Sequence, residues 1–177
     1  MQRKILVLLT TTAVLAIAAF GQDTPAQARF QERSSIEVTL DGLTCNNSQG
    51  TIPALSWSFG VTTSGGTTTG GGVSAGKPSL TALSVNRRAD SCTPVLFGAA
   101  VIGKDFKQVT IVEQDKQKDD TFTVTLTDAV IASYQLGGEE SQEVPSEQIG
   151  FTFKKICVAD TGTGSKSCWD LTKGTTF

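Results

Sequence analysis

The stretch FTVTLTDAVIASYQLGG, residues 122–138, decides the class of fold. Every second residue from Phe122 to Leu136 is apolar, with Asp128 as the exception, and the stretch ends on two glycines. Alternation with a period of two is typical of a strand that buries one face, and paired glycines favour a turn. The sequence therefore predicts one long strand whose inward row is Phe122, Val124, Leu126, Val130, Ala132, Tyr134 and Leu136.

Asp128 interrupts the apolar row of this strand. A carboxylate on a buried face has either a catalytic role or a structural one, in which it accepts hydrogen bonds from backbone or hydroxyl groups at a bend. The structural role is the commoner of the two, so we expect Asp128 to mark a bend.

Shorter segments show the same alternation, and the chain of 177 residues is long enough for one core but too short for two ordinary domains. The prediction is an all-β fold over residues 35–177, a small antiparallel β-barrel of two sheets with one short α-helix. The other inward rows are expected to be Ile36, Val38 and Leu40; Leu55, Trp57, Phe59 and Val61; Val109 and Ile111; and Ile149, Phe151 and Phe153.

The helix is predicted over Thr93 to Ile102, where the alternation stops. Thr93 can cap the helix, Pro94 suits its first turn and Gly103 can end it. The segment is apolar on most sides, so we expect the helix to plug the mouth of the barrel.

The composition excludes several classes of function. The chain has no histidine, which removes Ser-His-Asp and Cys-His nucleophiles and imidazole metal ligands. Its formal net charge is −2 and charged residues make up 18%, so it lacks the basic surface that a phosphate backbone requires. We therefore expect no enzymatic activity, no cofactor, no metal and no nucleic-acid partner.

Three patterns match catalytic or ligand-binding motifs only in part. GGVSAGK, residues 71–77, begins like a phosphate-binding loop, but Pro78 stands where a metal-binding hydroxyl is needed. Ser74 and Lys77 match the S-x-x-K pair of serine acyl-transferases, which needs a helical turn that Pro78 disfavours. An exported hydrolase is therefore the weakest alternative. A third pattern is acidic and is expected to be a solvated loop, because it lacks calcium-loop spacing: Glu139, Glu140, Glu143 and Glu147.

The N-terminus has the composition of a signal peptide. Arg3 and Lys4 precede an apolar run from Ile5 to Phe20, which is shorter than the roughly 20 residues of a membrane-spanning helix. Small residues suit cleavage after residue 21 or residue 28, so we predict a signal peptide within residues 1–28 and a polar leader over residues 29–34. An uncleaved anchor is the alternative.

All four cysteines follow this leader, as in a disulfide framework of an exported protein. Cys157 and Cys168 flank a turn-rich segment that would bring two strands back antiparallel, so we predict that they pair, which leaves Cys45 with Cys92. A zinc site is the alternative, but the sequence has no C-x-x-C pair.

Residues 62–72, TTSGGTTTGGG, contain no apolar side chain and cannot contribute to a core. We expect them to form a mobile loop. Loops of this length in compact domains are usually functional or disordered.

Six stretches in a fixed order resemble the Hcp family, the tube-forming haemolysin-coregulated proteins of type VI secretion systems. They extend the likeness from about residue 35 to the C-terminus. The stretches are LSWSFGV (55–61), GGGVSAGKPSLTALSVNRRAD (70–90), TPVLFGAAVIGK (93–104), LTDAVIASYQLGG (126–138), VPSEQIGFTFKKI (144–156) and WDLTK (169–173).

The resemblance implies a barrel of two antiparallel sheets with one short helix, which closes head-to-tail into a hexameric ring. Stacked rings would form a tube with an effector or cargo protein in its lumen. The family's extended loop, which reaches toward neighbouring subunits, falls on Val61, Thr62, Thr63, Ser64, Gly65, Gly66, Thr67, Thr68, Thr69, Gly70, Gly71 and Gly72.

Together with the predicted leader and disulfides, the resemblance implies an exported ring former, secreted or periplasmic, without stable membrane insertion after processing. The alternative is a monomeric exported binding or adhesion module that keeps the barrel and has lost the ring. The mass of the mature protein in solution separates the two.

Overall fold

The computed structural model describes residues 34–45, 50–67, 73–118 and 120–177. The predicted signal peptide lies outside these residues, as does the predicted polar leader except for Ser34, which begins the first strand. Within the described ranges, no helix is long and apolar enough to cross a membrane.

Strands make up most of this structure, as predicted. They are β1 (Ser34–Leu40), β2 (Thr51–Ala54), β3 (Ser56–Ser58), β4 (Val61–Thr67), β5 (Val73–Leu80), β6 (Leu83–Arg88), β7 (Asp105–Asp115), β8 (Asp120–Gly137), β9 (Ser146–Asp160), β10 (Ser165–Asp170) and β11 (Thr175–Thr176), with helix α1 (Thr93–Val101) between β6 and β7.

Nine of these strands form one antiparallel sheet in the order β11-β10-β9-β8-β7-β1-β2, and β6 pairs with both β9 and β3. Only Leu55 separates β2 from β3, and its amide donates to the Asn86 carbonyl on β6 at 2.8 Å. The pairing therefore runs from β1 through β7, β8, β9, β6 and β3, and returns to β1 through β2. This circuit closes the small barrel that the sequence predicts.

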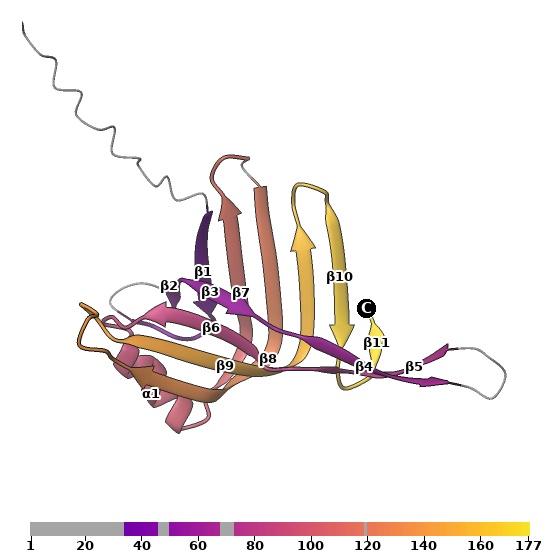
Figure 1. Cartoon of the computed structure of the whole chain (residues 1–177), viewed down its shortest axis with the longest axis horizontal. Helices are drawn as coiled ribbons and strands as arrows, with labels where there is room; N and C mark the ends of the chain where they lie inside the picture. Colours follow the sequence, from indigo (N-terminus) through magenta and orange to yellow (C-terminus); the bar gives the residue numbers. More distant parts are fainter. Residues whose placement is uncertain (1–33, 46–49, 68–72, 119) are drawn as a thin grey trace, which may run out of the picture. The chain divides into compact units, whose positions relative to one another are not determined.

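The long strands β8 and β9 belong to both sides of the barrel. The first residues of β9 pair with β6, and its last residues pair with β10. Figure 1 shows β8 and β9 changing direction between their two halves. The two bent strands therefore continue from one side of the barrel to the other, so that the two sides form one hydrogen-bonded sheet.

Asp128 stands at this bend with a φ of 50°, a left-handed conformation that aspartate tolerates better than most residues. Val124 and Leu126 are buried before it, and Ala129 and Ile131 are buried after it. The inward face of β8 therefore changes from even to odd residue numbers at Asp128.

The single inward row predicted for residues 122–136 is correct only for its first half and for Tyr134. Leu136 is 54% exposed, Ala132 is exposed and Val130 is only half-buried. Tyr134 packs against the core as predicted, because the register of β8 against β9 shifts again between Ile131 and Ser133. The bend at Asp128 is confirmed, but its carboxylate is partly exposed and pairs with two amines rather than with backbone or hydroxyl groups: Lys107 at 3.8 Å and Lys154 at 3.5 Å.

The core fills the barrel with the side chains of the other predicted rows. Fully or almost fully buried are Val38, Leu40, Val109, Ile111, Ile149 and Phe151. Leu55 and Val61 are exceptions, at 58% and 54% exposed. Leu55 lies at the corner between β2 and β3, and Val61 already belongs to β4, so neither continues the inward row of β3.

Helix α1 begins at Thr93 as predicted and ends at Val101, one residue before the predicted end, but its N-terminal cap is different. Cys92 is the N-cap and makes no side-chain capping bond, whereas Thr93 is already helical. At the other end Gly103, with a φ of 62°, donates to the Ala100 carbonyl and ends the helix as expected. The helix buries only Leu96 and Ala99, so it covers the barrel with one face and does not plug it.

Candidate subunit interface

The segment predicted to be a mobile loop forms much of a β-hairpin instead. Strands β4 and β5 pair antiparallel from Val61 opposite Leu80 to Thr67 opposite Val73, with a register shift between Thr63 and Gly65. The remaining residues, 68–72, lie outside the described part. Apolar alternation could not reveal strand β4, because it consists mostly of threonine and glycine, of which threonine favours strands without being apolar.

The hairpin is a two-stranded sheet of its own, which pairs with no strand of the nine-stranded sheet. Its base is clamped where the Gly60 amide donates to the Thr81 hydroxyl at 2.8 Å and the Thr81 amide donates to the Gly60 carbonyl at 2.9 Å. Residues 61–65 are all exposed. Gly76, Pro78 and Leu80 of β5 are half-buried, and Leu80 packs against the core. The hairpin is thus held at its root, and strand β4 is the part that it exposes to solvent.

The S-x-x-K match and the second half of the partial phosphate-loop match lie on strand β5 of this hairpin. Residues 73–80 form strand β5, so Ser74 and Lys77 do not share a helical turn, and no helix follows Gly76 to face a phosphate. Among the described residues, no group of three or more cysteine, aspartate or glutamate side chains is placed to hold a metal ion.

A second exposed surface is the outer side of α1, which we call the α1 face. It consists of Val95, Phe97, Val101 and Ile102, which are 38%, 55%, 67% and 75% exposed. No residue from Thr93 to Gly103 carries a charge. Contiguous exposed apolar side chains of this kind mark interaction sites on soluble proteins.

Covalent and polar contacts fix the start of α1. Cys92 forms a disulfide with Cys45, which follows β1, and both cysteines are buried. The Thr93 hydroxyl accepts from the Asp90 amide at 2.9 Å and donates to Glu147 Oε1 at 3.1 Å. The α1 face is therefore held rigidly against the barrel.

Glu147 and Arg87 form a buried ion pair beneath the start of the helix, and both side chains are fully inaccessible. Arg87 also contacts Asp90 at 2.5 Å and donates from Nε to the Pro53 carbonyl at 3.2 Å. Tyr134 donates its hydroxyl to the second oxygen of Glu147. Burial, together with this hydrogen bond, raises the pKa of Tyr134.

The prediction that Glu147 belongs to a solvated acidic loop is therefore wrong, although Glu139, Glu140 and Glu143 are exposed as expected. Glu147 is the second residue of β9, and its partner Arg87 is 60 positions away. A local charge pattern carries no signal of such a pair, because the partner is brought in by the pairing of β6 with β9.

Both predicted disulfide bonds are formed. Cys157 and Cys168 are directly opposite each other on β9 and β10, with Cα atoms 4.1 Å apart. Cys45 and Cys92 join the segment after β1 to the helix N-cap, with Cα atoms 5.3 Å apart. No cysteine of the chain is free.

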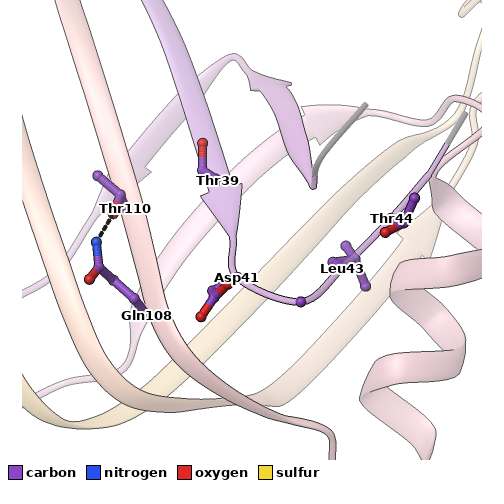
Figure 2. Close-up of a pocket in the computed structure, with 7 residues that line it drawn as sticks. Thr39, Asp41, Leu43, Thr44, Gln108 and Thr110 are labelled. Atoms are coloured by element: carbon purple, nitrogen blue, oxygen red, sulfur yellow. Dashed lines mark hydrogen bonds between the residues drawn. The ribbon is translucent and has the colours of Figure 1, made fainter. Parts of the chain in front are cut away.

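A hollow of about 570 Å³ lies beside the end of β1 (Figure 2). Its lining is polar, and Gln108 donates to the Thr110 hydroxyl across one wall at 2.9 Å. Asp41 is the one carboxylate among the lining residues, so the hollow offers no pair of groups for acid–base catalysis. The lining residues are Thr39, Asp41, Gly42, Leu43, Thr44, Gln108 and Thr110.

Residues 42–159 match the family model described as "Type VI secretion system effector, Hcp". Among solved structures, the chain is similar to Hcp1 from Salmonella typhimurium, with a TM-score of 0.66 and 20% identity over 82% of this chain and 99% of that one.

A structure titled as a type six secretion system protein gives a TM-score of 0.70 with 19% identity, and covers 81% of this chain and 99% of its own. A type VI secretion system effector from Yersinia pestis gives 0.61 with 21% identity, over 76% and 98% of the two chains. At these identities the solved structures show the shared fold. Among curated proteins, no relative matches this chain.

Proposed function

This chain belongs to the Hcp family of type VI secretion systems, and we propose that it is a non-enzymatic structural subunit that closes head-to-tail with copies of itself into a hexameric ring. The ring stacks into a tube, and the lumen holds an effector or cargo protein. The subunit acts through its surfaces and not through reactive side chains.

The observation that carries this proposal is the β4–β5 hairpin. It pairs with no other strand in the part of the chain that the structure describes, and its strand residues 61–65 are exposed. An isolated two-stranded hairpin is only marginally stable in water. A neighbouring subunit supplies the missing contacts, which makes Val61 to Gly72 the interface segment.

In such a contact the hairpin of one subunit meets a different surface on the next subunit, so the contact is heterologous. Heterologous contacts repeated through a closing rotation generate rings, and those that do not close generate filaments. A closed barrel suits this use because its sheet is completed within the chain, which reduces uncontrolled pairing through free strand edges.

The disulfides support the proposal that this ring former works outside the cytosol. Disulfides persist in the periplasm and outside the cell and are rare in reducing compartments. All four cysteines of this chain are bonded. We place the mature protein in the periplasm or in the medium, after removal of a signal peptide within residues 1–28.

The test is the mass of the mature, oxidised protein, measured by light scattering coupled to size-exclusion chromatography and by negative-stain imaging. The expected species is a ring of six subunits. A single subunit that persists at high protein concentration contradicts the proposal and favours the monomeric binding module. Fractionation of the producing cells tests the localisation separately.

A further inference from the structure

The α1 face has no partner among the other described elements. Its central residues Phe97 and Val101 are 55% and 67% exposed, and only the edge of the Phe97 ring meets another aromatic ring, that of Tyr134 at 5.9 Å. The two buried side chains of the helix, Leu96 and Ala99, are on the side that faces the barrel. The apolar surface that remains is available to a second molecule.

The α1 face is also prepared for binding before a partner arrives. The Cys45–Cys92 disulfide holds the N-cap, the Thr93 hydroxyl is bonded to the buried Glu147, and Gly103 closes the other end. A surface that is already ordered loses little conformational entropy when it binds.

The β4–β5 hairpin of the same chain does not cover this face. Figure 1 shows α1 and the hairpin at opposite ends of the part of the chain that contains both. A contact between a helix and a hairpin of this protein must therefore join two different molecules.

We propose that the α1 face of one subunit is the surface on which the β4–β5 hairpin of a second copy docks. The inference rests on the proposed function, that the chain assembles with itself, and it names the two surfaces that meet. Each copy carries one hairpin and one α1 face, so the contact repeats from one subunit to the next.

Charge favours the hairpin over the turn between β7 and β8 and over the segment between β8 and β9, and the length of the hairpin favours it over the four-residue turn between β9 and β10. Between Val61 and Leu80 the only charged residue is Lys77, and Val61 adds an exposed apolar side chain at 54%. The turn between β7 and β8 carries Asp115, Lys116 and Lys118, and the segment between β8 and β9 carries three glutamates. Placing such charges on an uncharged apolar helix costs far more than placing threonine and glycine there.

The test uses two lysine substitutions and a matched control in the mature, oxidised protein. Val101→Lys puts a charge on the α1 face, at the helix C-terminus where a cation does not disturb the helix dipole. Thr63→Lys puts the same charge on the hairpin. Gln117→Lys puts it on an exposed turn outside both surfaces.

Each of the first two variants is expected to weaken assembly by about 100-fold in apparent dissociation constant, because a charge must be buried in the contact. Gln117→Lys is expected to assemble like the wild type. Circular dichroism and thermal melting of the monomers check that all three keep the fold, which is expected because residues 63, 101 and 117 are exposed.

Mixing the two defective variants identifies the partners. Val101→Lys retains an intact hairpin and Thr63→Lys retains an intact α1 face, so the mixture is expected to form dimers that extend no further, seen by native mass spectrometry. If the mixture stays monomeric, if either variant assembles alone, or if Gln117→Lys also fails, the inference is wrong. A wild-type protein that stays monomeric overturns the proposed function instead.

Discussion

The barrel and the β4–β5 hairpin are both antiparallel ladders, but they are completed in different ways. The barrel closes on itself through Leu55, buries apolar side chains from several strands and places an ion pair beneath α1. The hairpin is clamped at Gly60 and Thr81 and packs Leu80 against the core, but it exposes residues 61–65. Stability of the single chain should therefore reside in the barrel, and the hairpin should matter only between chains.

The largest expected effects come from the two disulfides, which allow a comparison within the barrel. Cys45 and Cys92 are 47 positions apart and Cys157 and Cys168 are 11 apart, so chain entropy predicts losses of about 4 and about 3 kcal/mol when each pair is replaced by alanine. Paired unfolding curves measure the difference. A larger loss from the shorter loop would show that strain or native contacts, and not loop length, dominate.

The next effect in size is loss of the buried ion pair of the barrel. Glu147→Ala removes the buried carboxylate and leaves the buried Arg87 guanidinium only the partly exposed Asp90 carboxylate, so it should lower the free energy of unfolding by about 3 kcal/mol. Urea unfolding of the oxidised protein measures it. The control is Glu143→Ala, an exposed neighbour that should change the value by less than about 0.5 kcal/mol. Equal effects from the two variants would contradict the assigned role of Glu147.

A smaller effect is expected at the bend of β8. Asp128→Val forces a β-branched residue to a φ of 50° and should cost about 1–2 kcal/mol. Asp128→Gly suits that conformation and loses only ion pairs with Lys107 and Lys154 that are largely exposed, so its cost should stay below about 1 kcal/mol. If valine is tolerated as well as glycine, the left-handed residue does not produce the bend.

The turn that follows β10 should make the stability of the barrel depend on pH in the acidic range. The Thr172 hydroxyl donates to the Asp170 carboxylate and, together with the Lys173 and Thr172 amides and the Lys155 amine, lowers its pKa from 3.8 to about 2.

Because the folded pKa lies below the unfolded one, Asp170 stabilises the fold fully above pH 3.8 and loses that contribution as the pH falls through 2. Thr172→Val should make the stability fall at a higher pH, and Asp170→Asn should remove this part of the pH dependence. Thermal melts between these pH values test it. An unchanged profile in both variants would contradict the assignment.

The smallest effect on the single chain is expected at the hairpin. Thr63→Lys should change the free energy of unfolding of the monomer by less than about 0.5 kcal/mol, because residue 63 is exposed and touches no part of the barrel core. Urea unfolding under dilute, monomeric conditions measures it. A loss comparable to that of the Glu147 variant would show that the hairpin is part of the barrel's own stability.

Several features were predictable from sequence because their cause is local. The alternation around Val109, Ile111, Ile149 and Phe151 marks strands that bury one face, and these side chains are in the core. The turn between Cys157 and Cys168 sets their strands antiparallel and so places the two sulfurs opposite each other. Gly103 ends the helix because it adopts a left-handed conformation easily.

The candidate interface was only partly predictable. The sequence located the Thr/Gly segment and its lack of charge, but it indicated a loop over residues 62–72 where strand β4 forms, because neither threonine nor glycine shows in an apolar period. The apolar character of α1 was apparent, whereas the side that stays exposed depends on how Leu96 and Ala99 meet the barrel.

The sequence by itself determined the all-β class and the short helix, since each depends on residue types within a few positions of one another. It also determined the Cys157–Cys168 pair through the turn between them, which left Cys45 with Cys92. Only the tertiary structure decided that the inward face of β8 changes at Asp128, that Glu147 is buried against Arg87, and that the hairpin pairs with no other described strand. These outcomes depend on strand pairing between distant segments, which sets burial and register and which no local pattern encodes.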